Sequence, residues 1–160
     1  AGKYDLPTEA QWEMAARGSC EKNGSTAGNA AGCKAAMRTY PWGEQAATCT
    51  YAVIKDGASG CGASMTAAVG SKVAGASPYG LQDMAGNVSE WTRDWFSGTY
   101  YTTLSVTDPE NTKSALKRTV RGGAFNYNGY DVRAGARQDA DAGPFDVHYD
   151  VGLRCSRSSP

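Results

Sequence analysis

Asparagine, tyrosine, aspartate and histidine are concentrated in one part of this 160-residue sequence, between residues 126 and 150. They make up 11 of those 25 residues but only 15 of the other 135. Turn formation alone does not explain this, because turns favour glycine, serine and proline more than tyrosine. Tyrosine supplies rigid amphipathic contact area, and asparagine and aspartate supply adaptable hydrogen bonds, as in antibody paratopes. The composition predicts a ligand-binding surface, with an ordinary irregular loop as the alternative.

The predicted surface consists of aromatic, imidazole, amide and carboxylate side chains: Asn126, Tyr127, Asn128, Tyr130, Asp131, Asp139, Asp141, Phe145, His148 and Tyr149. Two arginines against five aspartates give the 126–150 segment a net charge of −3. A cationic or neutral polar partner is therefore expected.

A second candidate site is the segment "DMAGNVSE" at residues 83–90. Asp83 and Glu90 bracket a turn at Gly86, and such a turn combines carboxylates with backbone carbonyls, the oxygen ligands that calcium prefers. From spacing alone, a solvated acidic turn is the alternative. Trp91 and Trp95 are four residues apart, so they would share one face of a helical turn and pack into the core.

The five cysteines are Cys20, Cys33, Cys49, Cys61 and Cys155. The first four form two local pairs without the close spacing of zinc sites. Two loop-closing disulfides, 20–33 and 49–61, are the simplest arrangement, and they favour an oxidising, exported setting. Cys155 is left over and is expected to be buried and reduced.

Lysine plus arginine and aspartate plus glutamate both number 16, so the net charge is zero and no field attracts nucleic acid. No apolar run approaches a membrane span. Thr8 and Gln11 form a capping box for one helix that Gly18 ends. Residues 116–120 and 151–153 are predicted as short strands. The sequence thus predicts one loop-rich α+β domain over residues 1–160.

Five motifs occur in order: "LPTEAQWEMAARG", "YPWG", "SPYGLQDMAGNVSEWTRDW", "RTVRGGAF" and "VGLRCSR". Together they resemble the formylglycine-generating-enzyme-like family, also called the sulfatase-modifying factor family. The resemblance covers nearly the whole chain and implies a variant of the C-type lectin fold. That fold carries catalytic and purely binding members.

The resemblance also bears on catalysis. Formylglycine-generating members bind copper through two cysteines shortly after the glycine turn, but the matching residues 124–137 contain none. We therefore expect no copper and a non-catalytic domain. One alternative is a metal-dependent oxidase or sulfoxide-synthase-like enzyme completed elsewhere, although His148 is the sole histidine. A structural subunit of a surface assembly is the other.

The resemblance assigns the calcium ligands as the Asp83 and Glu90 side chains and the carbonyls of Gly86 and Val88. It pairs the cysteine equivalent to Cys155 with a position that is Ala16 here, which implies a free Cys155. Relatives begin with strands upstream of the first motif. Either the fold is pared down here, or a partner chain supplies those N-terminal strands.

Residues 121–155 also resemble the variable region of ligand-binding proteins from diversity-generating retroelements, which use this fold. Their adenine-directed mutagenesis converts asparagine codons toward Tyr, Asp, His and Ser, a set close to the one present here. The resemblance implies a receptor-type module that binds a protein or glycan in an extracellular, cell-surface or periplasmic location.

Overall fold

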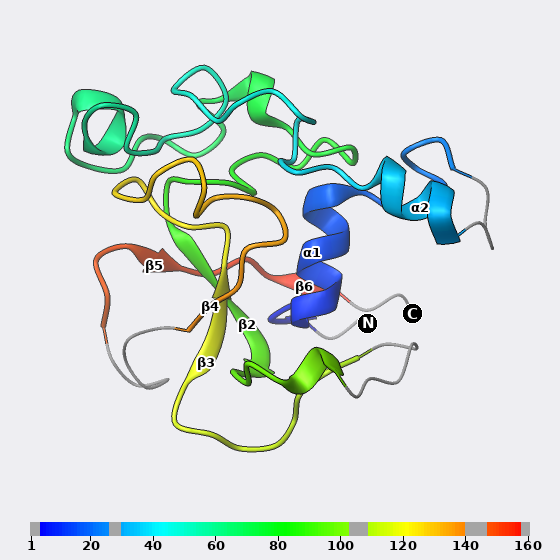
Figure 1. Ribbon diagram of the computed structural model, residues 1–160. Coiled ribbons are helices and arrows are strands. Elements are labelled where there is room, and N and C mark those ends of the chain that lie inside the picture. Colours follow the sequence, from blue (N-terminus) through cyan, green and yellow to red (C-terminus); the bar gives the residue numbers. More distant parts are fainter. Residues whose placement is uncertain (1–3, 26–29, 103–108, 140–146, 158–160) are drawn as a thin grey trace.

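The computed structural model describes residues 4–25, 30–102, 109–139 and 147–157. A four-stranded sheet with the strand order β4-β3-β2-β5 lies at its centre (Figure 1). Strand β2 (Ser89–Trp95) pairs antiparallel with β3 (Arg118–Arg121), which pairs antiparallel with β4 (Gln138–Asp139). Strand β5 (Val151–Gly152) runs parallel to β2. The two strands predicted from apolar stretches are confirmed as β3 and β5.

The remaining elements surround this sheet. Strands β1 (Tyr4–Asp5) and β6 (Ser156–Arg157) form a separate antiparallel pair. Helix α1 (Glu9–Arg17) contacts β2 and β3, and α2 (Ala30–Ala36) follows it. Three short 3₁₀ helices complete the described elements: Ser59–Gly62, Val73–Gly75 and Tyr100–Thr102. None of the described helices is long and apolar enough to cross a membrane.

Helix α1 begins and ends where the sequence predicts. The Thr8 hydroxyl accepts a hydrogen bond from the Gln11 amide (3.2 Å), and the Gln11 side chain accepts one from the Thr8 amide (3.0 Å). Gly18 follows the helix with a φ of 82°, a conformation that disfavours side chains. Trp12 and Ala16 are buried between the helix and the sheet.

Strand β2 differs from the prediction of a helical turn with a buried tryptophan pair. In a strand, side chains alternate between the two faces. Here Glu90, Thr92 and Asp94 are buried, whereas Trp91 and Trp95 lie on the half-exposed face. The core-packing interpretation of the two tryptophans is therefore wrong, because the polar residues between them point inward.

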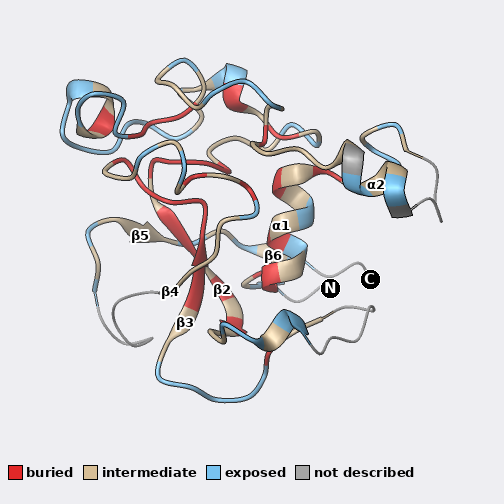
Figure 2. Cartoon of the chain, viewed as in Figure 1, coloured by how far each residue is buried: buried red, intermediate tan, exposed pale blue. Residues whose placement is uncertain are grey.

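Buried residues gather along β2 and β3 (Figure 2), and the buried residues of the domain include charged side chains as well as apolar ones. The buried Glu9 carboxylate accepts hydrogen bonds from Arg137 Nε (2.6 Å) and Nη2 (2.9 Å). Arg121, which has no exposed surface, pairs with Glu13 and lies 3.4 Å from Glu9. Because buried charges need such partners, these pairs make the sheet dependent on α1.

Asp94 links β2 to two other segments. Its carboxylate accepts hydrogen bonds from the Glu9 amide (2.7 Å), at the start of α1, and from the Asn111 amide (2.8 Å). Burial raises the pKa of Asp94, although the two amide hydrogen bonds oppose that change. The side chain thereby fixes where α1 meets the sheet.

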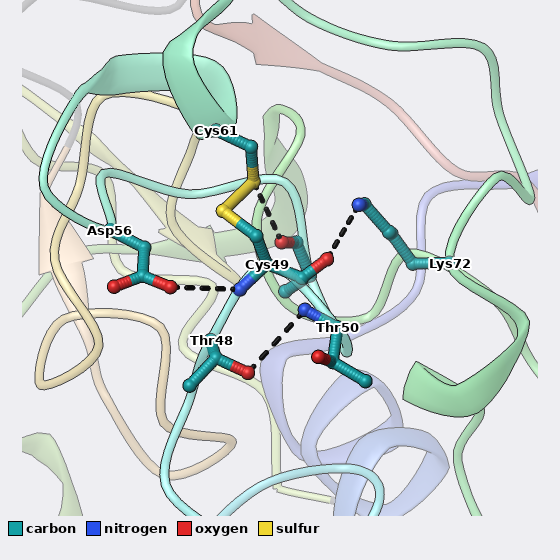
Figure 3. Close-up of a disulfide and its surroundings, with 7 residues drawn as sticks. Thr48, Cys49, Thr50, Asp56, Cys61 and Lys72 are labelled. Atoms are coloured by element: carbon teal, nitrogen blue, oxygen red, sulfur yellow. Dashed lines mark hydrogen bonds between the residues drawn. A yellow bond between two sulfur atoms is a disulfide. The ribbon is translucent and has the colours of Figure 1, made fainter.

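Both predicted disulfides are confirmed, Cys20–Cys33 and Cys49–Cys61. Figure 3 shows the second one, where the Cys49 amide donates to Asp56 (3.1 Å) and the Cys49 carbonyl accepts from Lys72 (2.5 Å). Residues 45–80, which contain this disulfide, form a helix-poor layer above the sheet (Figure 1).

Cys155 is free, as predicted, but it is exposed rather than buried. The chain is extended between β5 and β6, so successive side chains alternate sides. Arg154 turns inward to Glu90, which leaves Leu153 and Cys155 facing outward.

Candidate functional site

A glycine turn places the predicted binding segment at the end of β3. Gly122 and Gly123 have φ values of 92° and 66°, in the left-handed region that side chains rarely adopt. A Cβ at Gly123 would lie only 2.8 Å from Val132 Cγ1. The Gly122 carbonyl also accepts a hydrogen bond from the Gly86 amide (3.0 Å), so the turn joins the two candidate sites.

Buried residues fix the segment on both sides of its exposed part, residues 126–131, called the 126–131 loop below. Ala124 and Phe125 precede the loop, and Val132 and Ala134 follow it, all of them buried. The Phe125 amide donates to the Asn87 carbonyl (3.0 Å). The loop is therefore held by the core as well as by its own turn, in which the Asp131 amide donates to the Asn128 carbonyl (3.1 Å).

Arg121 adds a second anchor from below. Its guanidinium donates to the carbonyls of Ala134 (2.9 Å) and Ala136 (2.7 Å). The Ala134 amide in turn donates to the Thr39 carbonyl (2.9 Å). The chain that leaves the loop thus has its backbone groups satisfied on both sides.

Within the 126–131 loop, Asn128 and Tyr130 are exposed, the latter by 68%. The Asn128 side chain accepts the Tyr130 amide (2.9 Å). The Arg133 guanidinium lies 3.7 Å from the centre of the Tyr130 ring. Tyr127 is half-buried against the apolar core, and Asp131 is also half-buried. Asn128 and Tyr130 are therefore the side chains that the loop chiefly exposes.

The second part of the predicted surface meets the first at Asn126. Its side-chain amide donates to the Tyr149 hydroxyl (3.2 Å) and to the Asp150 carboxylate (3.2 Å). Tyr149 is 77% exposed, and its ring makes an edge contact with Phe125. Asn126 Oδ1 and His148 Nε2 are buried atoms without a hydrogen-bond partner among the described residues. Such atoms leave polar capacity for a ligand or water.

The other predicted residues lie elsewhere or outside the described residues. Asp139 belongs to β4, where it pairs with Thr119. Asp141 and Phe145 fall between 140 and 146, outside the described part of the chain.

Sequence reasoning missed an aromatic stack beside the 126–131 loop. Tyr40, Trp42 and Tyr51 stack in series with ring centres 5.0 Å apart at each step. The Tyr40 hydroxyl donates to the Gly129 carbonyl (3.1 Å), which connects the stack to the loop. The spacing of two aromatic residues in "YPWG" was the available signal.

The predicted calcium ligands partly converge. Asp83, Val88 and Glu90 line a cavity of about 380 Å³. Asp83 has a φ of 55°, and one of its carboxylate oxygens accepts the Gly70 amide (2.6 Å). The cavity also contains Gln82, whose buried Oε1 has no hydrogen-bond partner among the described residues.

Glu90 already has three hydrogen-bond donors. Trp12 Nε1 (2.7 Å) and Arg154 Nε (3.0 Å) donate to Oε2, and Arg154 Nη2 (2.7 Å) donates to Oε1. An ionised carboxylate has about four lone-pair positions, so one position on Oε1 is left. Arg154, which is paired with both Glu90 oxygens, also lines this cavity. Among the described residues, no group of three or more His, Cys, Asp or Glu side chains could hold a metal.

The family model of the sulfatase-modifying factor enzyme 1-like domain matches residues 1–159. The chain belongs to this family. It is 36% identical to the formylglycine-generating enzyme of Thermomonospora curvata, over 98% of this chain and 50% of that protein. It is 33% identical to the serine/threonine-protein kinase pkn1 of Chlamydia pneumoniae, over 96% of this chain and 21% of the kinase. The chain thus spans half or less of these relatives.

Among solved structures, the domain is similar to Treponema denticola variable protein 1. The TM-score is 0.65 and the identity 26%, over 95% of this chain and 46% of that protein. The predicted α+β fold of the formylglycine-generating-enzyme type is therefore confirmed.

Proposed function

We propose that this domain is a non-catalytic, exported ligand-binding module, with its binding surface on the 126–131 loop and residues 147–150. The observation that carries the proposal is the exposure of Tyr130, in a loop that buried residues flank, and of Tyr149, whose hydroxyl accepts a hydrogen bond from Asn126. Rigid aromatic groups lose little conformational entropy on binding. A protein or glycan is the expected ligand.

Two further observations support a binding role. The domain is similar to a protein named as variable, and the segment that follows its own glycine turn is the one rich in tyrosine and asparagine. Residues 124–137 contain no cysteine, the residue type through which the enzymes of the family bind copper. The two disulfides favour an oxidising compartment, such as the cell exterior or the periplasm.

Retroelement diversification of residues 121–155 is part of the proposal. The gene neighbourhood tests it: a reverse transcriptase gene beside a near-copy of the coding segment is the expected finding. A neighbourhood with neither would remove diversification from the proposal and leave ligand binding to be tested separately.

The binding test compares wild type with the triple variant Asn128→Ala/Tyr130→Ala/Tyr149→Ala on arrays of glycans and extracellular proteins. We expect at least one ligand to be lost in the triple variant, while its melting temperature stays within a few degrees of wild type. Tyr4→Ala is the matched control, because Tyr4 is also 68% exposed and also lies beneath an arginine, Arg157. Identical binding by all three proteins would refute the proposed surface.

A metal-dependent oxidase is the rival function, and the similarity of the chain to a formylglycine-generating enzyme supports it. Metal analysis of the purified domain separates the two. Stoichiometric copper or iron would support the enzyme, whereas calcium alone agrees with the binding module. Calcium at the 83–90 turn would be held by Asp83, Glu90 and the carbonyls of Gly86 and Val88, and it would share the Glu90 carboxylate with Arg154.

A further inference from the structure

A small cavity next to the 126–131 loop is lined by Arg17, Thr39, Arg133 and Gly135. Its volume is about 190 Å³. Pockets for drug-sized ligands begin at roughly 300 Å³, so this cavity suits one functional group. Two of the four lining residues are arginines and none is acidic. Guanidinium groups bind oxyanions through paired N–H donors.

The Arg133 side chain is held in one orientation, but its terminal N–H donors are not all used by hydrogen bonds within the described residues. Its Nε donates to the Tyr130 carbonyl (2.8 Å), and its plane lies over the Tyr130 ring. Neither terminal nitrogen has a hydrogen-bond partner among the described residues. The side chain therefore combines a fixed position with free donors at the edge of the proposed surface.

Arg17, at the end of α1, is in a similar state. Its Nε donates to the Arg38 carbonyl (3.1 Å), and its Nη1 donates to Glu13 (2.7 Å). In the described part of the chain, Nη2 has no partner. Glu13 also pairs with the buried Arg121, so one carboxylate serves two guanidinium groups.

A further carboxylate, that of Glu44, is bonded to Thr39, one of the residues that line the cavity. Both Glu44 oxygens accept hydrogen bonds from Thr39, one from its amide (2.7 Å) and one from its hydroxyl (2.6 Å). These bonds, and then the charges of Arg17 and Arg38, lower the pKa of Glu44. Counting these two arginines and Arg133 against Glu44 and the Glu13 carboxylate leaves one positive charge.

We propose that the cavity binds a carboxylate group of the partner, an Asp or Glu side chain of a protein. This inference rests on the proposed function, because Arg133 belongs both to the cavity and to the Tyr130 platform. A protein is favoured because a tyrosine- and asparagine-rich surface is of the paratope type. The net charge of residues 126–150 did not reveal this cationic cavity, because one of its arginines, Arg17, lies outside that segment, in α1. Arg137, which that count included, is paired with Glu9 instead.

Acetate and sulfate are the probes, titrated into ¹⁵N-labelled domain at constant ionic strength. Chemical shifts of the Arg17 and Arg133 Nε–H groups and of the Gly135 amide are followed. We expect saturable shifts with acetate. Shifts that never saturate would overturn the site, and tighter binding of sulfate than of acetate would overturn the carboxylate in favour of a sulfated ligand.

Two variants test the cavity in different ways. Arg133→Gln removes charged donors and should weaken acetate binding about tenfold, since a hydrogen bond to a charged group contributes on that order. Gly135→Ala keeps every charge: its backbone is not left-handed, and the added methyl lies 3.4 Å from Arg17 Nη1. The methyl should weaken acetate binding by narrowing the cavity, with the melting temperature unchanged.

Arg157→Gln, which removes an exposed arginine on β6, is the control and should bind acetate as wild type does. Wild-type affinity in both Arg133→Gln and Gly135→Ala would overturn the inference. Gly135→Ala decides alone if Arg133→Gln fails to fold. The probes need no partner, so a failure here leaves the array test of the Tyr130 surface unaffected.

Discussion

Arg121 shows how a single residue connects the scaffold to the proposed binding surface. It directly precedes Gly122 and Gly123 of the glycine turn, yet its side chain is fully buried. It pairs with Glu13 on α1 and donates to the Ala134 and Ala136 carbonyls behind the 126–131 loop. One guanidinium thus fixes a helix and a loop relative to each other.

Arg121→Gln should lower the free energy of unfolding by about 3–5 kcal/mol, since removing one partner of a buried ion pair leaves the other uncompensated. Chemical denaturation measures this difference. Arg157→Gln is the control, because an exposed arginine contributes less than about 1 kcal/mol. A loss below about 1 kcal/mol for Arg121→Gln would contradict the anchoring role.

At the residue scale, the sequence predicted which side chains are exposed better than which are buried. Tyr130 and Tyr149 were identified from composition, and both are exposed. Cys155 was expected to be buried because unpaired cysteines usually are, but the inward position belongs to Arg154. That choice depends on Glu90, which lies 64 residues away.

At the element scale, local signals were sufficient for α1 and insufficient for β2. The capping box of α1 lies within four residues, so sequence alone defines it. Residues four apart share a face in a helix and also in a strand, so Trp91 and Trp95 could not distinguish the two. The inward-facing carboxylates of β2 have distant partners that spacing does not reveal: Asp94 accepts the Glu9 amide, and Glu90 pairs with Arg154.

The two disulfides provide an element-scale prediction. They close loops of nearly equal length, with separations of 13 and 12 residues, so loop entropy alone would give similar stabilisation of about 3 kcal/mol each. Among the residues that the structure describes in the two loops, only those of the Cys49–Cys61 loop include fully buried core residues, Ala52, Val53 and Ile54. We therefore expect Cys49→Ala/Cys61→Ala to lower the melting temperature more than Cys20→Ala/Cys33→Ala. Equal losses would show that packing adds nothing to the cross-link.

At the scale of the whole molecule, the proposed calcium ion would stabilise the turn that supports both candidate sites. Removing calcium with a chelator should lower the melting temperature, because a ligand at 100 times its dissociation constant stabilises a fold by about 2.7 kcal/mol. Magnesium should not restore the loss, since it requires a stricter octahedron. Equal melting with and without the chelator would contradict the site.

Asp83→Gly is the matched variant for this measurement. Glycine accepts the positive φ of Asp83 without strain. The change removes the carboxylate and its hydrogen bond from the Gly70 amide, so the variant should melt lower than wild type, but the further shift caused by the chelator should disappear. Glu90→Gln is less informative, because the change would also disturb Trp12 and Arg154 whether or not calcium is present.

Strands β1 and β6 carry a consequence for how this domain is connected. Tyr4 pairs with Arg157, so the first and last strands lie side by side, away from the sheet edge that bears β5 (Figure 1). In a longer polypeptide, the segments before β1 and after β6 would therefore start close together, an arrangement that suits insertion of the domain into a loop of another protein. A tag fused before β1 or after β6 should orient the tyrosines identically on a sensor surface.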